Sequence, residues 1–195
     1  MAISPRYTSA DLELLPDIEG VRYEIIDGEL YVTKQPHAGH QYTTTRFVSE
    51  LDQWDRQTGA GVAMVAPGLV FAADNDVAPD LVWVSMERLR HVLDASGHFR
   101  AAPELIVEVL SPGARNIRRD RELKLDLYSR QGVDEYWIAD WRLREIQVYR
   151  RQQAALHVVG TLRDGDLLTS PLLPGFSCDV SSLWGPIPPG PADDQ

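Results

Sequence analysis

Cysteine and long apolar runs are scarce in this sequence, and each scarcity excludes a class of protein. Cys178 is the only cysteine among 195 residues, so no disulfide can form within the chain, which suits a reducing compartment. No apolar run approaches the roughly 20 residues that a membrane-spanning helix needs. Residues 1–15 lack the basic start and apolar block of a secretory signal. We therefore expect a cytoplasmic protein without membrane association.

Basic residues are outnumbered by acidic ones. Nineteen Lys and Arg residues against 29 Asp and Glu residues give a net charge of -10. Such a surface repels nucleic acid at long range, so tight non-specific binding to DNA is not expected. Residues 115–130 are locally richer in basic than in acidic side chains. This segment is either a basic patch or a solvated helix face with mixed ion pairs.

The motifs of several common enzyme classes are also missing. The sequence contains no Walker A loop, no GxGxxG and no GxSxG motif. Five histidines and one cysteine show no zinc-binding spacing. These absences argue against a P-loop NTPase, a dinucleotide-binding enzyme, an α/β-hydrolase and a zinc protein.

Two kinds of periodicity predict the secondary structure that is present. Asp27-Gly28 separates two β-rich runs and predicts a hairpin. Apolar residues at helical spacing predict long helices over residues 37–57 and 117–131, with short helices near 8–15 and 86–95. Further strands are expected at 61–66, 69–73, 80–85, 104–110, 135–140, 145–151 and 155–162, while 74–79 and 111–116 are expected to be loops.

This order of elements predicts the fold class and the domain organisation. A hairpin, a helix, several strands, a second helix and further strands indicate an α/β (α+β) protein with a mixed sheet and helices packed against it. We expect a single domain over residues 1–184. Residues 185–195 contain too much Pro and Gly to pack, so a disordered tail is expected there.

Glu108 interrupts an otherwise apolar strand. Because side chains alternate along a strand, Glu108 shares one face with Ile106 and Leu110. Both faces are apolar, which predicts a central strand. An unpaired ionised carboxylate would be strongly destabilising there, so Glu108 requires a cation or several hydrogen-bond donors.

Asp80 follows Pro79 at the start of another apolar strand. An acid at the mouth of one strand, close to an acid within a neighbouring strand, can form a hard-cation site. Mg²⁺ suits such a site because it takes carboxylate oxygens together with several waters. The alternative is that Asp80 is a turn residue closing the polar segment 74–79.

Lys124 is the third candidate, because a helical wheel places it on a core-facing stripe. That stripe contains Asp120 and Lys124 together with Ile117, Leu123, Leu127 and Tyr128. Lys124 could reach the two acids, where a lysine and a metal can polarise a phosphodiester and activate water. It could instead pair with Asp120 and extend past the core edge, or form a purely structural network with Asp120 and Glu108.

These elements and motifs resemble the PD-(D/E)XK nuclease superfamily and, more closely, the Uma2 family of restriction-endonuclease-like proteins. The resemblance covers most of residues 10–180 and is carried by RYEIIDGELY, APDLVWV, PELIVEVLSPG, DRELKLDLY and GVDEYWIAD. It implies a restriction-endonuclease-like mixed sheet flanked by helices, with an N-terminal hairpin. It also implies an endodeoxyribonuclease that uses Mg²⁺ or Mn²⁺ to hydrolyse DNA, as a homodimer. The alternative is a catalytically inactive nucleic-acid-binding or accessory module that retains the fold.

The resemblance also implies roles for individual residues. Asp80 and Glu108 match the two metal-binding acids, and the backbone carbonyl of Val109 is an expected further ligand. The superfamily lysine normally lies two residues after the second acid, but Leu110 occupies that position. Lys124 is the expected substitute, because a side chain from the following helix can reach the same space.

Glu24 and His40 complete the expected set. The resemblance suggests that Glu24 is an extra catalytic acid near the metal; otherwise it is an exposed hairpin residue with Tyr23 and Ile25 facing inward. His40 either assists proton transfer or contacts phosphate, or it is merely structural. Asp140 is expected only to end its strand.

Overall fold

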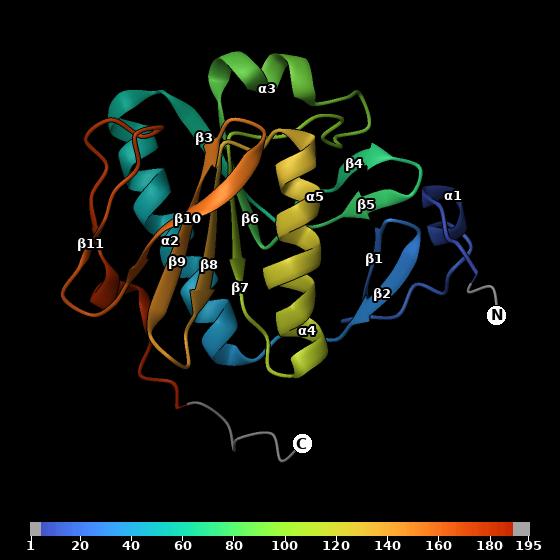
Figure 1. Ribbon diagram of the computed structural model, residues 1–195, viewed down its shortest axis with the longest axis horizontal. Coiled ribbons are helices and arrows are strands. Elements are labelled where there is room, and N and C mark those ends of the chain that lie inside the picture. The colour runs from blue at the N-terminus through green and yellow to red at the C-terminus, as the bar shows by residue number, and fades with distance from the viewer. Residues whose placement is uncertain (1–4, 189–195) are drawn as a thin grey trace.

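The computed structural model describes residues 5–188 of the chain. Most of the tail expected at 185–195 therefore lies outside the described residues, and residues 185–188 form no helix or strand. Two sheets lie next to one another, with helices on both sides of the larger one (Figure 1). Within residues 5–188, no helix is both long and apolar enough to cross a membrane.

The larger sheet has six strands in the order β10-β9-β8-β7-β6-β3. The strands are β3 (Gly61–Val65), β6 (Leu81–Ser85), β7 (Leu105–Val109), β8 (Glu135–Asp140), β9 (Glu145–Gln152) and β10 (Ala155–Leu162). Only β7 and β8 are parallel, and a parallel pair requires a crossover connection. A helical segment supplies that crossover, so it lies across the sheet beside β7.

The predicted hairpin is confirmed, but it belongs to a second sheet of order β2-β1-β5-β4. Its strands are β1 (Arg22–Ile26), β2 (Glu29–Thr33), β4 (Leu69–Ala72) and β5 (Asn75–Val77). Asp27 and Gly28 have φ values of 48° and 75°, as a type I′ turn requires. The loop predicted at 74–79 is wrong over β5, because pairing with β1 and β4 makes this polar segment a strand.

Four further helices and a short sheet belong to other parts of the described chain. They are α1 (Ser9–Leu12), α2 (Ala38–Thr58), α3 (Met86–Val92), the 3-10 helix η2 (Val180–Leu183), and the strands β11 (Leu167–Leu168) and β12 (Cys178–Asp179). The first three helices confirm the sequence predictions. The long helix α2 ends at Gly59, whose φ of 63° is the left-handed conformation typical of a helix stop.

The second long helix begins earlier than predicted and is not regular. It consists of α4 (Ala114–Arg118), a π-helical turn η1 (Arg119–Leu123) and α5 (Lys124–Gln131), which we call the α4–α5 helix. The expected loop is wrong at 114–116, because Gly113, with φ of 98°, turns the chain directly into the helix. A π-turn contains an extra residue and is frequent at functional sites.

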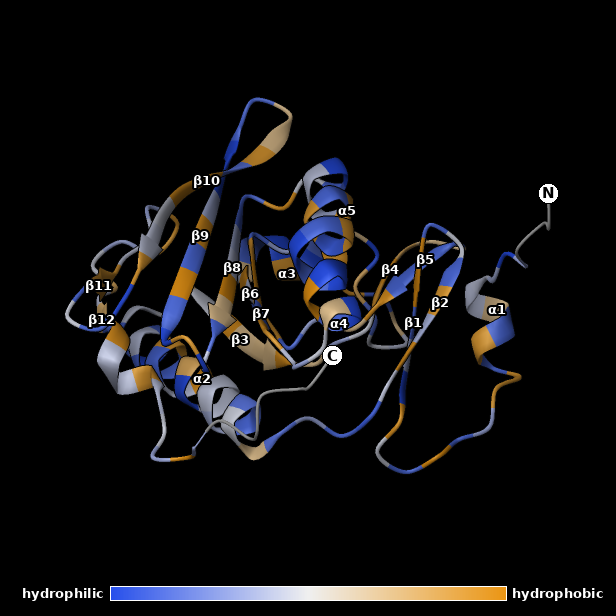
Figure 2. Ribbon diagram, turned by 60° about the horizontal axis from the view of Figure 1, so that its bottom comes forward, coloured by the Kyte–Doolittle hydropathy of each residue, from blue (hydrophilic) through white to orange (hydrophobic). Residues whose placement is uncertain are grey.

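Two apolar cores cover the two faces of the larger sheet. Leu105, Val107 and Val109 of β7 pack in the core on the α2 side, whereas Ile106 and Leu110 pack in the core on the α5 side. Hydrophobic residues are concentrated on the central strands β6 and β7 (Figure 2). All five residues of β7 are buried, which confirms the predicted central strand. Glu108 lies on the α5 face, as its position in the alternation predicts.

Candidate active site

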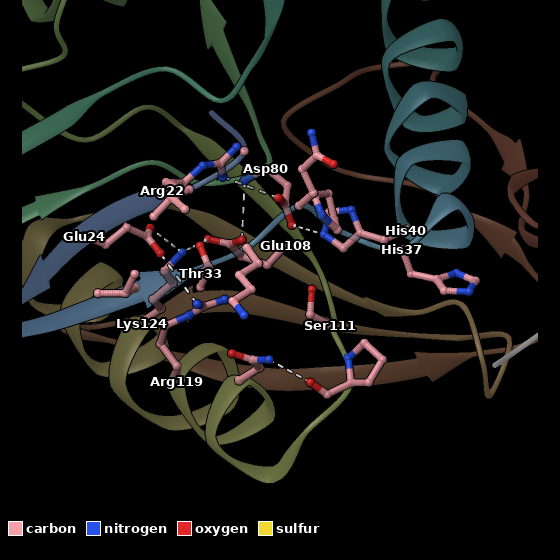
Figure 3. Close-up of a pocket in the computed structure, with 18 residues that line it drawn as sticks. Arg22, Glu24, Thr33, His37, His40, Asp80, Glu108, Ser111, Arg119 and Lys124 are labelled. Carbon is pink, nitrogen blue, oxygen red and sulfur yellow. Dashed lines mark hydrogen bonds and ion pairs between the residues drawn. The ribbon is translucent and has the colours of Figure 1, made fainter. Parts of the chain in front are cut away.

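A cavity of about 550 Å³ opens between the second sheet, the start of α2 and the α4–α5 helix. Glu24, His40, Asp80, Glu108 and Lys124 all line it, although they come from five different parts of the chain (Figure 3). The convergence predicted from the sequence is therefore present in the structure. Val109, Asp120 and Asp140 are not among the residues lining this cavity.

Strand pairing brings the two predicted metal-binding acids together. β6 and β7 are antiparallel neighbours with Leu81 opposite Val107, so Asp80 lies beside Glu108. The Asp80 amide donates to Glu108 Oε2 at 3.3 Å, and the Val109 amide donates to Asp80 Oδ2 at 2.8 Å. These backbone donors orient both carboxylates toward the cavity.

Lys124 reaches the same acids from the helix. Its Nζ lies 2.8 Å from Glu24 Oε1, 2.8 Å from Glu108 Oε1 and 4.0 Å from Asp120 Oδ1. The reading in which Lys124 extends past the core edge is wrong, because the residue is only 1% exposed. Asp120 instead pairs mainly with Arg119, at 2.8 Å.

Glu24 is a buried member of the cluster. It is 2% exposed, and its Oε1 accepts a hydrogen bond from the Ala78 amide at 3.0 Å. The exposed-hairpin alternative is wrong because β1 is an inner strand of the second sheet, flanked by β2 and β5. Arg119 lies 3.7 Å from Glu24 Oε2, so this acid joins the helix to the second sheet.

His40 contacts one of the predicted metal ligands. Its Nε2 lies 3.0 Å from Asp80 Oδ2, and the residue is 5% exposed. The first turn of α2 therefore holds Asp80 from the side opposite Lys124 (Figure 3). Asp140, in contrast, ends β8 and pairs with Arg142, as expected.

Two residues of this cluster were missed by sequence reasoning. Tyr128 donates its hydroxyl to Glu108 Oε1 at 3.0 Å, and its spacing from Lys124 on one helical stripe was the available signal. Arg119 was counted only as part of the basic segment. That segment is otherwise a helix face with mixed ion pairs, such as Arg118–Glu122 and Arg130–Asp126, which confirms the second reading of residues 115–130.

Comparison with known proteins agrees with the motifs. The model of the Uma2 family, described as "Putative restriction endonuclease", matches residues 9–181. The chain belongs to the Uma2 family. A "putative nuclease belonging to DUF820" from Anabaena variabilis ATCC 29413 has a similar structure, with a TM-score of 0.71, 19% identity, and coverage of 90% of this chain and 96% of that one. This likeness shows a shared fold.

A second solved structure is less similar to the Uma2 chain. The type IIG restriction endonuclease BpuSI matches with a TM-score of 0.39 and 17% identity, over 72% of this chain and 14% of its own. No match was found among curated proteins.

The acids of the Uma2 site differ in their affinity for protons. Burial raises the pKa of Glu108 to about 8, because the nearby charges of Asp80, Asp120 and Glu24 add to the effect of burial and the Lys124 ammonium only partly opposes it. Glu108 therefore binds a proton more readily than an exposed glutamate does.

Asp80 and Glu24 behave in the opposite way. Burial by itself would raise the pKa of Asp80, but the hydrogen bonds from His40 and the Val109 amide lower it to about 2. Burial of Glu24 is likewise outweighed by the Lys124 charge, which lowers the pKa of this acid. Neighbouring carboxylates whose pKa values are driven apart are typical of sites that bind a cation or transfer protons.

The donor set of the cavity fits a hard cation with few protein ligands. Within residues 5–188 there is no group of three or more His, Cys, Asp or Glu side chains arranged to hold a metal. Asp80 and Glu108 nevertheless present two carboxylates to one cavity. Mg²⁺ is commonly bound by one or two carboxylates with several waters, whereas zinc requires more nitrogen or sulfur ligands. The residues present therefore fit Mg²⁺.

Proposed function

We propose that this Uma2 chain is a metal-dependent endodeoxyribonuclease, a hydrolase of DNA phosphodiester bonds, whose domain spans residues 1–184. The observation that carries the proposal is that Asp80, Glu108 and Lys124 share one cavity, although they lie on separate elements. Membership of a family described as "Putative restriction endonuclease" supports it.

Asp80 and Glu108 would hold Mg²⁺, or Mn²⁺ in its place, and the Val109 carbonyl is the expected third protein ligand. When bound, the ion would stabilise charge on the phosphate and lower the pKa of an attacking water. Hydrolysis adds that water to phosphorus and breaks one P–O bond, which leaves a phosphomonoester and a hydroxyl.

Lys124 supplies the second positive charge of the proposed mechanism. It is 1% exposed, and charge stabilisation is stronger in such a water-excluded place than at a surface. Glu24 supports the site by fixing the Lys124 ammonium at 2.8 Å. Its pairing with Arg119 also holds the second sheet against the helix.

Cleavage assays with matched variants test the proposal. Plasmid and single-stranded DNA are incubated with the protein in Mg²⁺ or Mn²⁺, and the wild-type chain is expected to cut. Asp80→Asn, Glu108→Gln and Lys124→Ala should abolish cutting, whereas Glu87→Gln, on the exposed face of α3, should not. Circular dichroism establishes that each variant is folded. Cleavage that persists in a folded Glu108 or Lys124 variant would contradict the assignment.

A non-catalytic nucleic-acid-binding module is the second candidate. It is favoured by the Lys124 ammonium, which two acids already engage. Calorimetric titration with Mn²⁺ separates the candidates, since the absence of metal binding would favour this module.

The homodimer and the cytoplasmic location implied earlier stay predictions. Light scattering coupled to size-exclusion chromatography tests the first, and fractionation of cells tests the second.

A further inference from the structure

The reacting groups lie at the floor of the cavity. Glu24 and Glu108 are 2% exposed and Lys124 is 1% exposed, while the Asp80 side chain is 12% exposed. The phosphates of a duplex lie on a stiff cylinder, so a groove or protruding side chains must meet them. An unpaired strand is more flexible, and proteins bind it with basic grooves and aromatic side chains on which its bases stack.

The dimensions of the cavity indicate a short segment of one strand. Its volume of about 550 Å³ is within the range of roughly 300–1,000 Å³ for pockets that enclose a single small ligand. Residues 20–22 and 32–36 form one wall of the cavity. Gly20, with φ of 75°, lies so close to Gln35 that a Cβ atom would be 2.7 Å from the Gln35 Cγ. Gly20 therefore allows Gln35 to pack closely against it in this wall.

The charged side chains that line the cavity can attract such a segment of one strand. The charged side chains lining the cavity are four basic and three acidic, namely Arg22, Lys34, Arg119, Lys124, Glu24, Asp80 and Glu108. The chain as a whole has a net charge of -10. Arg22 is 41% exposed and Lys34 is exposed, so these two cations are accessible from solvent. A long duplex would meet the acidic surface, whereas a short strand would meet mainly the cavity.

One aromatic ring, that of His37, belongs to the lining of the cavity, and Trp141 beneath it is buried. The ring of His37 stacks on Trp141, with centroids 4.7 Å apart and planes 12° apart. The His37 Nδ1 also accepts a hydrogen bond from the Gly39 amide at 3.0 Å, which fixes the ring at the start of α2. A Cβ at Gly39 would be 2.5 Å from the indole, so glycine permits this packing. Unpaired bases stack on aromatic rings with about 1–3 kcal/mol per base.

Building on the proposed nuclease function, we propose that the substrate is an unpaired DNA strand. Its scissile phosphate enters the cavity, and one base stacks on the free face of the His37 ring, the platform, whose other face packs on Trp141. The recessed acids, the basic side chains of the cavity and the His37 ring all favour a strand whose bases are free.

Three DNAs of the same sequence test the substrate class. They are a single strand, a duplex closed by hairpin loops of non-cleavable phosphorothioates, and the same duplex with a short unpaired gap. Cutting of the single strand and of the gap should be at least about tenfold faster than cutting of closed duplex. Equal rates on all three would overturn this inference and leave the nuclease proposal standing. No cutting of any substrate in Mg²⁺ or Mn²⁺ would instead contradict the nuclease proposal.

A double-mutant cycle tests the platform. His37→Asn keeps a side-chain acceptor for the helix start but removes the ring, and His91→Asn on the exposed face of α3 is the control. In Ca²⁺, fluorescence anisotropy should show single-stranded DNA binding weakened about 5- to 150-fold by His37→Asn alone. An abasic nucleotide, moved along the strand, should weaken wild-type binding at one position. With the abasic nucleotide at that position, His37→Asn should not weaken DNA binding any further. A full additional loss of affinity would contradict the stacking of a base on the platform.

Discussion

Lys124 on α5 places its Nζ 2.8 Å from Oε1 of Glu108 in the middle of β7. Both side chains are buried, at 1% and 2% exposure. The Lys124 charge is tolerated in the core because Glu24, whose pKa is lowered, and Glu108 both lie 2.8 Å from its ammonium, since an orphaned buried charge is costly. The atoms proposed to act on phosphate are therefore also atoms that hold the helix to the sheet.

The first prediction follows from this double role. Lys124→Met should lower the free energy of unfolding by about 3–5 kcal/mol, because the buried Glu24 carboxylate loses its nearest cation and Glu108 loses a hydrogen-bond donor. Urea denaturation at pH 7 measures the loss. The matched control is Lys34→Met, an exposed lysine, which should change stability by no more than about 0.5 kcal/mol. A loss below about 1 kcal/mol would contradict the burial argument.

The second prediction concerns pH. The folded state raises the pKa of Glu108 from 4.5 to about 8, so between these values it keeps a proton that the unfolded chain has released. This group therefore makes the free energy of unfolding fall as pH rises through that window, by at most about 1.4 kcal/mol per pH unit. Urea denaturation from pH 5 to 8 should show a flatter dependence for Glu108→Gln than for wild type. Parallel curves would refute the prediction.

The third prediction concerns His40. Its contact with Asp80 Oδ2 at 3.0 Å orients the carboxylate, and removing such a supporting partner typically costs 10- to 100-fold in metal affinity. His40→Ala should weaken Mn²⁺ binding by about this factor in calorimetry, and His40→Gln should restore part of it because its amide can donate. His91→Ala is the control. Unchanged Mn²⁺ affinity in His40→Ala would assign His40 a purely structural role.

The fourth prediction concerns the start of α2. Gly39→Ala should destabilise the protein by about 1–3 kcal/mol, because the added methyl group would overlap the Trp141 ring 2.5 Å away. Gly160→Ala is the matched control, since nothing lies within 4 Å of the place that its added methyl group would occupy on β10. Thermal denaturation measures both. Equal melting temperatures for the two variants would show that Trp141 moves aside without strain.

Local signals predicted much of the fold. Asp27-Gly28 forms the predicted turn because both residues adopt positive φ, which this dipeptide favours. β7 was predicted because its apolar residues occupy both faces. β5 was missed, since Asn75–Val77 is polar and becomes a strand only by pairing with its two neighbours. The π-turn was missed as well, because the wheel assumed a regular helix through Arg119–Leu123.

The candidate site, like the fold, was predicted only in part from the sequence. The sequence by itself determined that Glu108 lies within an apolar strand and needs a partner, because burying an unpaired charge is costly wherever it occurs. For Asp80 and Lys124 it left a turn and an exposed position open, and the structure decided between them. Only the tertiary structure decided that Glu24 and His40 approach these three. Their contacts join β1 and α2 to strands and a helix far away in the chain, and such pairings depend on how the sheets and helices pack rather than on local sequence.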